Sequence, residues 1–174
     1  DAAGMADLDA FTVHGGMTAE VSGTDGYALT VRTEDDTTVS QADGTAVCEG
    51  TLTMESPSVK SYTQAYRRES ASLTGWEQRA MLYGYGAVPL ACMDELTHQG
   101  NTWRFVFDSL PPLYAQSIQA LSESGGIAWE PGGEAVLAQI VRNGRIASQT
   151  LDLAWESGTL HVTASVTGEM DTAE

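Results

Sequence analysis

The amino-acid sequence predicts an α+β domain that is mainly antiparallel β, with a curved sheet and one or two helices packed on its concave face. Three observations support this class. Several stretches alternate apolar and polar side chains with a period of two, as strands with one dry and one wet face do. Asn-Gly and Asp-Gly pairs separate these stretches and predict hairpin turns. Helical patterns occur only in the middle of the chain.

The length of 174 residues fits a single domain over 1–174. The pattern divides it into four parts: N-terminal strands over 10–69, a central helical segment over 74–97, a strand and a helix over 102–124, and a C-terminal meander over 135–168. No fixed-period repeat and no low-complexity tract interrupts this order.

The N-terminal part of the sequence predicts several strands. FTVHGGMTAEV predicts a strand with a bulge or bend at Gly15-Gly16. YALTVRT and TTVSQ predict two further strands, with Glu34–Asp36 between them. For this acidic run we favour a solvated hairpin tip over a calcium site, because the EF-hand spacing is absent.

The next two strands are predicted to lie on either side of Ser56-Pro57, which breaks the extended pattern. Both alternate with a period of two, so each should present one set of side chains to each face. In the first strand one such set is Ala46, Cys48, Gly50, Leu52 and Met54, and in the second it is Tyr62, Gln64, Tyr66 and Arg68.

Two helices are predicted in the middle of the chain. TGWEQRAMLYG has Thr74 as a candidate cap and Glu77 three residues later, as in a capping box. PPLYAQSIQALSES begins with two prolines, which suit a helix start. Between them, WRFVFD predicts a strand with Trp103, Phe105 and Phe107 on one face.

The C-terminal third predicts a three-stranded antiparallel meander. An apolar run over 136–141 leads into Asn143-Gly144, a strong hairpin signal because both central residues of a type I′ turn need positive φ. Two alternating strands follow, joined by a turn at 156–159. Their predicted apolar positions are Ala147, Leu151, Leu153 and Trp155 in the first strand, and Leu160, Val162, Ala164 and Val166 in the second.

The charge balance excludes whole classes of partner. Eight basic residues face 24 acidic ones, a formal net charge of −16, and Lys60 is the one lysine. Such a chain repels phosphate backbones and anionic membrane surfaces, so we expect no nucleic-acid partner. We interpret the excess acid as a device for solubility. The sequence has no apolar run of transmembrane length.

No catalytic or metal-binding motif is recognisable, so we predict a protein that is not an enzyme and uses no cofactor or metal. The nucleophile elbow, the phosphate-binding loop and the zinc-binding spacings are absent. His14, His98 and His161 lie far apart in the sequence and are expected to be surface or hydrogen-bonded side chains. Cys48 and Cys92 are either buried thiols or one disulfide, with thiols favoured.

Aromatic side chains gather in the middle of the chain and in its C-terminal strands. They are either ordinary core or the lining of an apolar pocket between the sheet and its helices. As candidate ligand-binding residues we select Trp76, Tyr83, Trp103, Phe105, Phe107, Tyr114 and Trp155.

The order of elements resembles a known group. WRFVF, then PPLYAQSIQALSES, then the closing meander VLAQIVRNGRIASQTLDLAWESGTLHVTASVTG are similar to the end of the LolA/LppX-like lipoprotein-carrier half-barrels of bacterial envelopes. This resemblance implies an extracytoplasmic protein of the cell envelope, often lipid-anchored through a cysteine upstream of Asp1. It also implies a half-barrel whose concave apolar face takes lipid.

Three hypotheses about function follow. The first is a non-enzymatic extracytoplasmic (lipo)protein that binds a hydrophobic small molecule or lipid between sheet and helices. The second is a structural or protein-interaction β module of the cell envelope that binds through a sheet edge. The third is a glycan hydrolase whose paired carboxylates are unassigned. The sequence leaves the oligomeric state open.

Overall fold

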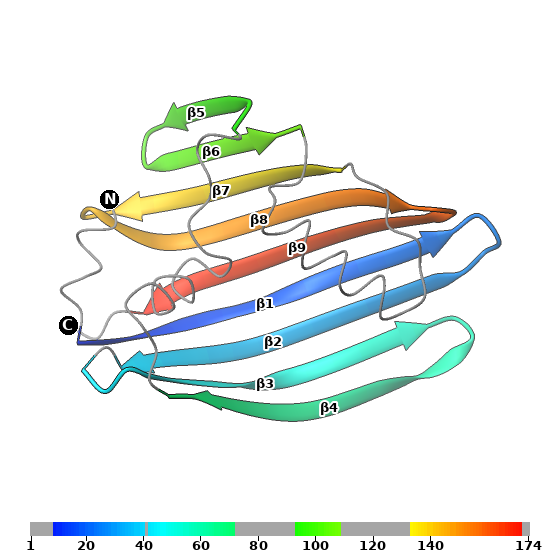
Figure 1. Ribbon diagram of the computed structural model, residues 1–174, viewed down its shortest axis with the longest axis horizontal. Helices are drawn as coiled ribbons and strands as arrows, with labels where there is room; N and C mark the ends of the chain where they lie inside the picture. Colours follow the sequence, from blue (N-terminus) through cyan, green and yellow to red (C-terminus); the bar gives the residue numbers. More distant parts are fainter. Residues whose placement is uncertain (1–8, 41, 72–92, 109–132, 172–174) are drawn as a thin grey trace.

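Nine strands form one antiparallel sheet in the computed structural model, which describes residues 9–40, 42–71, 93–108 and 133–171. The order across the sheet is β4-β3-β2-β1-β9-β8-β7-β6-β5, so the first and last described strands, β1 and β9, are neighbours (Figure 1). The strands are β1 (Ala10–Gly23), β2 (Ala28–Ser40), β3 (Thr45–Ser56), β4 (Val59–Ser70), β5 (Glu95–Gln99), β6 (Thr102–Phe107), β7 (Glu134–Arg142), β8 (Arg145–Ser157) and β9 (Leu160–Asp171).

The two faces of this sheet differ in chemistry. Because residues paired across strands point to the same side, the register starting from Phe11 defines one face over all nine strands, which we call the apolar face. The opposite side, which we call the polar face, carries Thr, Glu and Asp at most positions. The buried hydrophobic residues of the described part lie on the apolar face: Phe11, Val39, Ala46, Phe107, Ala135, Leu137, Ile146, Leu151, Val162 and Ala164.

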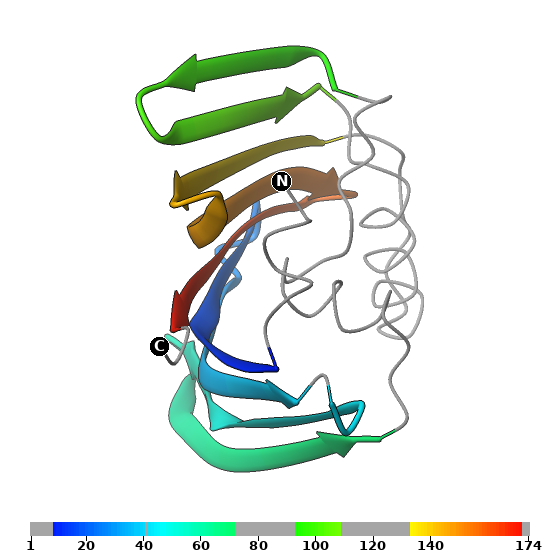
Figure 2. The ribbon, with the colours of Figure 1, turned by 90° about the vertical axis from the view of Figure 1, so that its left-hand side faces the viewer.

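The sheet bends into an open arc rather than a flat layer (Figure 2). Since the buried hydrophobic side chains all belong to the apolar face, we infer that this face lines the inside of the arc. Its densest part is a core cluster of Phe107, Ala135, Leu137 and Leu151, from β6, β7 and β8. Phe107 has no exposed surface, and burying such a side chain stabilises the fold by about 1.5–3 kcal/mol.

The predicted α+β class is wrong. The described residues form an all-β antiparallel sheet, and none of them is helical. The segment predicted as helical over 74–97 ends in strand β5 instead, because Leu96 and His98 alternate and pair with Phe105 and Trp103 of β6. Residues 74–92 of that segment and the helix predicted from Pro111 lie outside the described residues. The described residues therefore contain no helix that is long and apolar enough to cross a membrane.

Two predicted interruptions near the N-terminus are also wrong. β1 is one strand that runs without a register shift through Gly15-Gly16, so the predicted interruption is absent and no bulge is present there. β2 is one continuous strand, so Glu34–Asp36 lies in its middle and not at a hairpin tip. The polar run resembled a turn, but Glu34 and Asp36 are exposed on the polar face, and this allows the strand to continue.

The antiparallel strands predicted on either side of Ser56-Pro57 and in the C-terminal meander are confirmed. So are the side-chain sets predicted for β3 and β4, since Cys48 pairs with Arg68 and Gly50 with Tyr66. One detail differs in β8. A register shift next to Val141 places Ile146, and not Ala147, in the buried position.

Candidate functional site

A hollow of about 970 Å³ opens on the apolar face over β1 to β4, β8 and β9. Its volume lies near the top of the range of about 300–1,000 Å³ found for small-molecule sites. Aliphatic side chains supply part of its wall, together with the polar residues Thr33, Thr37, Gln149 and Thr167, and polar side chains of β4 stand along one rim. The aliphatic residues are Val13, Met17, Ala46, Leu52 and Val166, and the β4 residues are Gln64, Tyr66, Arg68 and Ser70.

Glycines make the floor of this hollow. One register row crosses β4, β3, β2, β1, β9 and β8 and reads Tyr66, Gly50, Asp35, Gly15, Gly168, Gln149. A Cβ on Gly15 would lie 2.6 Å from the carbonyl oxygen of Thr167, so a larger residue does not fit. Of the three glycines in this row, Gly15 and Gly168 line the hollow and leave the backbone there without side chains, which allows a ligand to approach the sheet closely.

Asp35 is the carboxylate on this floor. Tyr66 Oη donates a hydrogen bond of 2.8 Å to Asp35 Oδ2 across the gap above Gly50. Burial raises the pKa of Tyr66 to about 12, and the hydrogen bond to Asp35 adds to the shift. Tyr66 is therefore a neutral donor at neutral pH, and one oxygen of Asp35 is already engaged.

Arg68 is the cation at the rim. Its guanidinium carbon lies 5.5 Å from the centre of the Tyr66 ring, a cation–π distance. Within the described ranges, Arg68 has no carboxylate at ion-pair distance. The adjacent Arg67 points to the polar face, where it forms ion pairs with Glu49 and Glu69.

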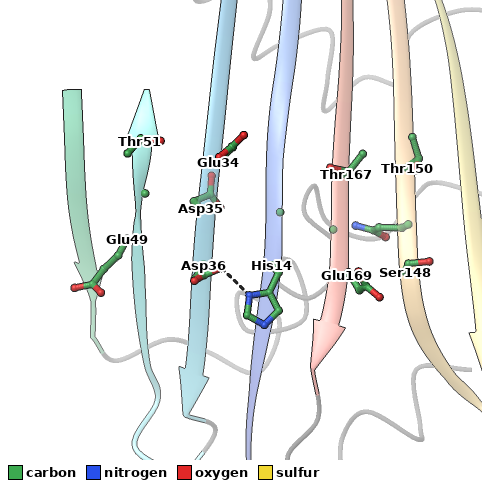
Figure 3. Close-up of a pocket in the computed structure, with 14 residues that line it drawn as sticks. His14, Glu34, Asp35, Asp36, Glu49, Thr51, Ser148, Thr150, Thr167 and Glu169 are labelled. Carbon is green, nitrogen blue, oxygen red and sulfur yellow. Dashed lines mark hydrogen bonds and ion pairs between the residues drawn. The ribbon is translucent and has the colours of Figure 1, made fainter. Parts of the chain in front are cut away.

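A second hollow, of about 650 Å³, lies on the polar face across β3, β2, β1, β9 and β8 (Figure 3). His14 Nδ1 lies 2.7 Å from Asp36 Oδ1, and this hydrogen bond raises the pKa of His14, with further raising charge from Asp171 and Glu169. Glu34, Glu49 and Glu169 in this hollow are exposed, and the half-buried Asp35 also borders it. In the part of the chain that the structure describes, no group of three or more His, Cys, Asp or Glu could hold a metal ion.

Four of the seven predicted ligand-binding aromatics are described, and all four are on the apolar face. Phe107 belongs to the core cluster, and Phe105 and Trp155 pack against it. Trp103 stacks on His98 with ring centroids 4.0 Å apart. None of the four lines the 970 Å³ hollow. Their contact with a ligand stays a prediction, and Trp76, Tyr83 and Tyr114 lie outside the described residues.

The residues that shape the hollow were only partly visible in the sequence. Tyr66 and Arg68 were predicted to share one side of a strand, and they do. Asp35 was missed because Glu34–Asp36 was interpreted as a turn. A signal was present: Leu29, Val31, Thr33, Thr37 and Val39 keep a period of two on either side of Asp35. Cys48 is a free, half-buried thiol in the wall of the hollow, and Cys92 is outside the described residues.

Comparisons with known proteins do not identify a family. No family model and no curated protein matches this sequence. Among solved structures, the dehydratase domain from the CurK module of curacin polyketide synthase is 12% identical, with 92% of this chain and 76% of that chain covered at a TM-score of 0.23. The GphF dehydratase P1711L variant is 12% identical, with 92% and 76% covered at a TM-score of 0.24.

An acyl-ACP thioesterase from Bacteroides thetaiotaomicron VPI-5482 is 10% identical, with 94% of this chain and 77% of that chain covered at a TM-score of 0.17. All three TM-scores are well below 0.5, so these likenesses carry no argument about fold or activity. The case for a function therefore rests on the geometry of the sheet.

Proposed function

We propose that this protein is a non-enzymatic binding module that holds a hydrophobic small molecule or a lipid chain against the inner, apolar face of its sheet. The observation that carries the proposal is the 970 Å³ hollow, which has aliphatic side chains in its wall and Gly15 and Gly168 in its floor. Each methylene group transferred there from water would contribute about 0.8 kcal/mol.

The position of the hollow supports a ligand of elongated shape. It spans β4 to β8, which are separated by five inter-strand steps in the sheet order. At about 4.8 Å per step, this corresponds to roughly 24 Å along the arc. A flexible alkyl chain can follow such a curved surface, whereas a rigid ring system of the same length cannot.

Cys48 offers a direct test, because its thiol lies in the wall of the hollow. In a Cys92→Ser background, the rate at which Cys48 reacts with N-ethylmaleimide is measured with and without a saturating single-chain lipid. We expect the lipid to slow the reaction by shielding the thiol. An unchanged rate, together with no lipid retained in native mass spectrometry, would overturn the proposal.

A matched control uses a thiol on the other side of the same strand. Thr51 lies on the polar face of β3, and its side chain is exposed. In a Thr51→Cys variant that lacks Cys48 and Cys92, the same lipid should leave the labelling rate unchanged. Protection of both positions would indicate general micelle binding and would also count against the proposal.

The compartment belongs to the same proposal. An extracytoplasmic location in the cell envelope, with or without a lipid anchor, rests on the resemblance to the LolA/LppX-like carriers. Fractionation of cells that express the full-length protein tests it, because recovery in the cytoplasmic fraction alone would contradict it.

A protein-interaction module is the second candidate function, and the unpaired outer edge of β4 favours it. This strand ends the sheet, and its outer edge pairs with no other strand of the described part. However, Lys60, Arg67 and Arg68 lie on it, and charged side chains on an edge disfavour the addition of further strands. We therefore rank this candidate second. The glycan-hydrolase hypothesis stays a prediction.

A further inference from the structure

The charges around the hollow on the apolar face are few and separated. Of the described residues that line it, only Asp35 and Arg68 are charged. Asp35 lies on β2 and Arg68 on β4, two strands away, where the described sheet ends. The hollow thus has a positive rim and a negative point on its floor.

Asp35 and Arg68 differ in whether they have a hydrogen-bond or ion-pair partner. The Asp35 carboxylate accepts the Tyr66 hydroxyl at 2.8 Å. Arg68 has the face of the Tyr66 ring beneath it and no carboxylate partner among the described residues. A guanidinium offers a fork of donors that fits carboxylate or phosphate oxygens in a bidentate way.

We infer that the ligand is an amphiphile with an anionic head group, a carboxylate or a phosphate, which binds Arg68 at the β4 rim while its tail crosses the glycine floor toward Met17 and Val166. This inference rests on the proposed function. It adds the charge of the ligand and its direction in the hollow.

The rest of the molecule favours this direction. A head group placed further inward would approach Asp35, which has the same sign of charge. On the outside, a protein of formal net charge −16 repels anions. An anionic head group therefore binds most favourably at the rim beside Arg68, and the tail contacts the aliphatic side chains of the wall.

The test compares ligands that share one tail and differ in the head. Laurate, dodecyl phosphate and the neutral monolaurin are titrated into the full chain by calorimetry, below their micelle concentrations. We expect the anions to bind about tenfold more tightly than monolaurin, since a charged hydrogen bond at a partly exposed site contributes on this order. The tighter of the two anions identifies the head-group chemistry.

Three arginine variants make the test specific. Arg68→Gln should remove the preference for anions, so that laurate and dodecyl phosphate bind no more tightly than monolaurin. Arg67→Gln, the same change on the adjacent residue of the opposite face, should keep the preference. Arg68→Glu should reverse it and favour dodecylamine over laurate.

The outcomes separate this inference from the function on which it rests. If laurate and monolaurin bind equally well, or if Arg68→Gln weakens both to the same extent, the head-group assignment is wrong while the hydrophobic site stands. If none of the probes binds to the wild-type chain, the proposed function itself fails. Thermal unfolding of each variant checks that it is folded before its affinity is interpreted.

Discussion

At Gly50 the neighbouring strand leaves no room for a side chain. A Cβ there would press against the carbonyl oxygen of Glu34 and lie 2.6 Å from the Cβ of Asp35. We expect Gly50→Ala to destabilise the protein by about 1–3 kcal/mol, the usual range for overpacking, because backbone atoms have to shift. Urea unfolding followed by circular dichroism measures the change.

Gly168 in the same register row is the matched control. A Cβ at Gly168 would meet Val13 Cγ1 at 3.3 Å, and that side-chain methyl group can move slightly. Both substitutions reduce the entropy of the unfolded chain equally, so their difference reports the native-state clash. We expect Gly168→Ala to change stability by less than about 1 kcal/mol. Equal losses at the two positions would show that the close approach at Gly50 is not the cause.

Tyr66 gives the protein a pH dependence in the alkaline range. Its pKa of about 12 in the folded state is above the ordinary value of 10.0 in the unfolded chain. Between these values the unfolded chain has lost the phenolic proton while the folded protein keeps it. The stabilising contribution is therefore complete below pH 10 and is lost as the pH rises toward 12.

Tyr66→Phe tests this at the same residue. The difference in phenolate absorbance between wild type and variant isolates Tyr66 from the other tyrosines, and we expect its midpoint near 12. The decline in stability above pH 10 should be shallower in the variant. A midpoint near 10.0 would contradict the burial and the hydrogen bond to Asp35.

At the scale of elements, the β7–β8 hairpin depends on its two turn residues. Asn143 has a φ of 52° and Gly144 a φ of 74°, both in the left-handed region. For residues other than glycine, asparagine and aspartate, this conformation costs about 1–2 kcal/mol. We therefore expect Gly144→Ala to lower the free energy of unfolding by about 1 kcal/mol.

Asn143→Gly is the control for the hairpin, because glycine accepts the same positive φ. It should leave stability within about 0.5 kcal/mol of wild type, the range of a neutral surface change. If Gly144→Ala also proves neutral, the turn conformation is not what holds β7 and β8 in register.

At the scale of the whole molecule, the acidic residues of the described strands lie mainly on the polar face. Along the strands of the described part, acidic residues such as Glu20, Asp152 and Glu169 point to the polar face, whereas Asp35 is on the apolar face. Like charges on neighbouring strands repel each other and destabilise the compact state. Since salt screens exposed charges, it should stabilise this protein.

We expect the thermal midpoint to rise as sodium chloride increases from about 10 mM to about 300 mM, where the Debye length falls well below 10 Å. Circular dichroism measures the midpoint. Sucrose at equal osmolality serves as the control for effects other than screening. A midpoint that falls or stays constant with salt would show that the acidic face costs no stability.

How far the sequence alone predicts this molecule depends on the range of the interaction. The faces of β3, β4 and β9 follow from period-two patterns within each segment, and so does the shared side of Tyr66 and Arg68. The path of β2 through Glu34–Asp36 does not, because a local acidic run matches a turn as well as a strand. In the folded sheet, Gly15 and Gly50 of the neighbouring strands pair with Asp35.

By itself, the sequence determined which stretches alternate, where several of the hairpins turn, and that the chain is acidic. These are local properties that a few consecutive residues encode. Only the tertiary structure decided that β1 lies beside β9, and that Gly50, Gly15 and Gly168 share a row with Asp35. Such neighbours are distant along the chain. They are joined by backbone hydrogen bonds, which are the same for every residue type, so no pattern within one segment specifies which strands pair.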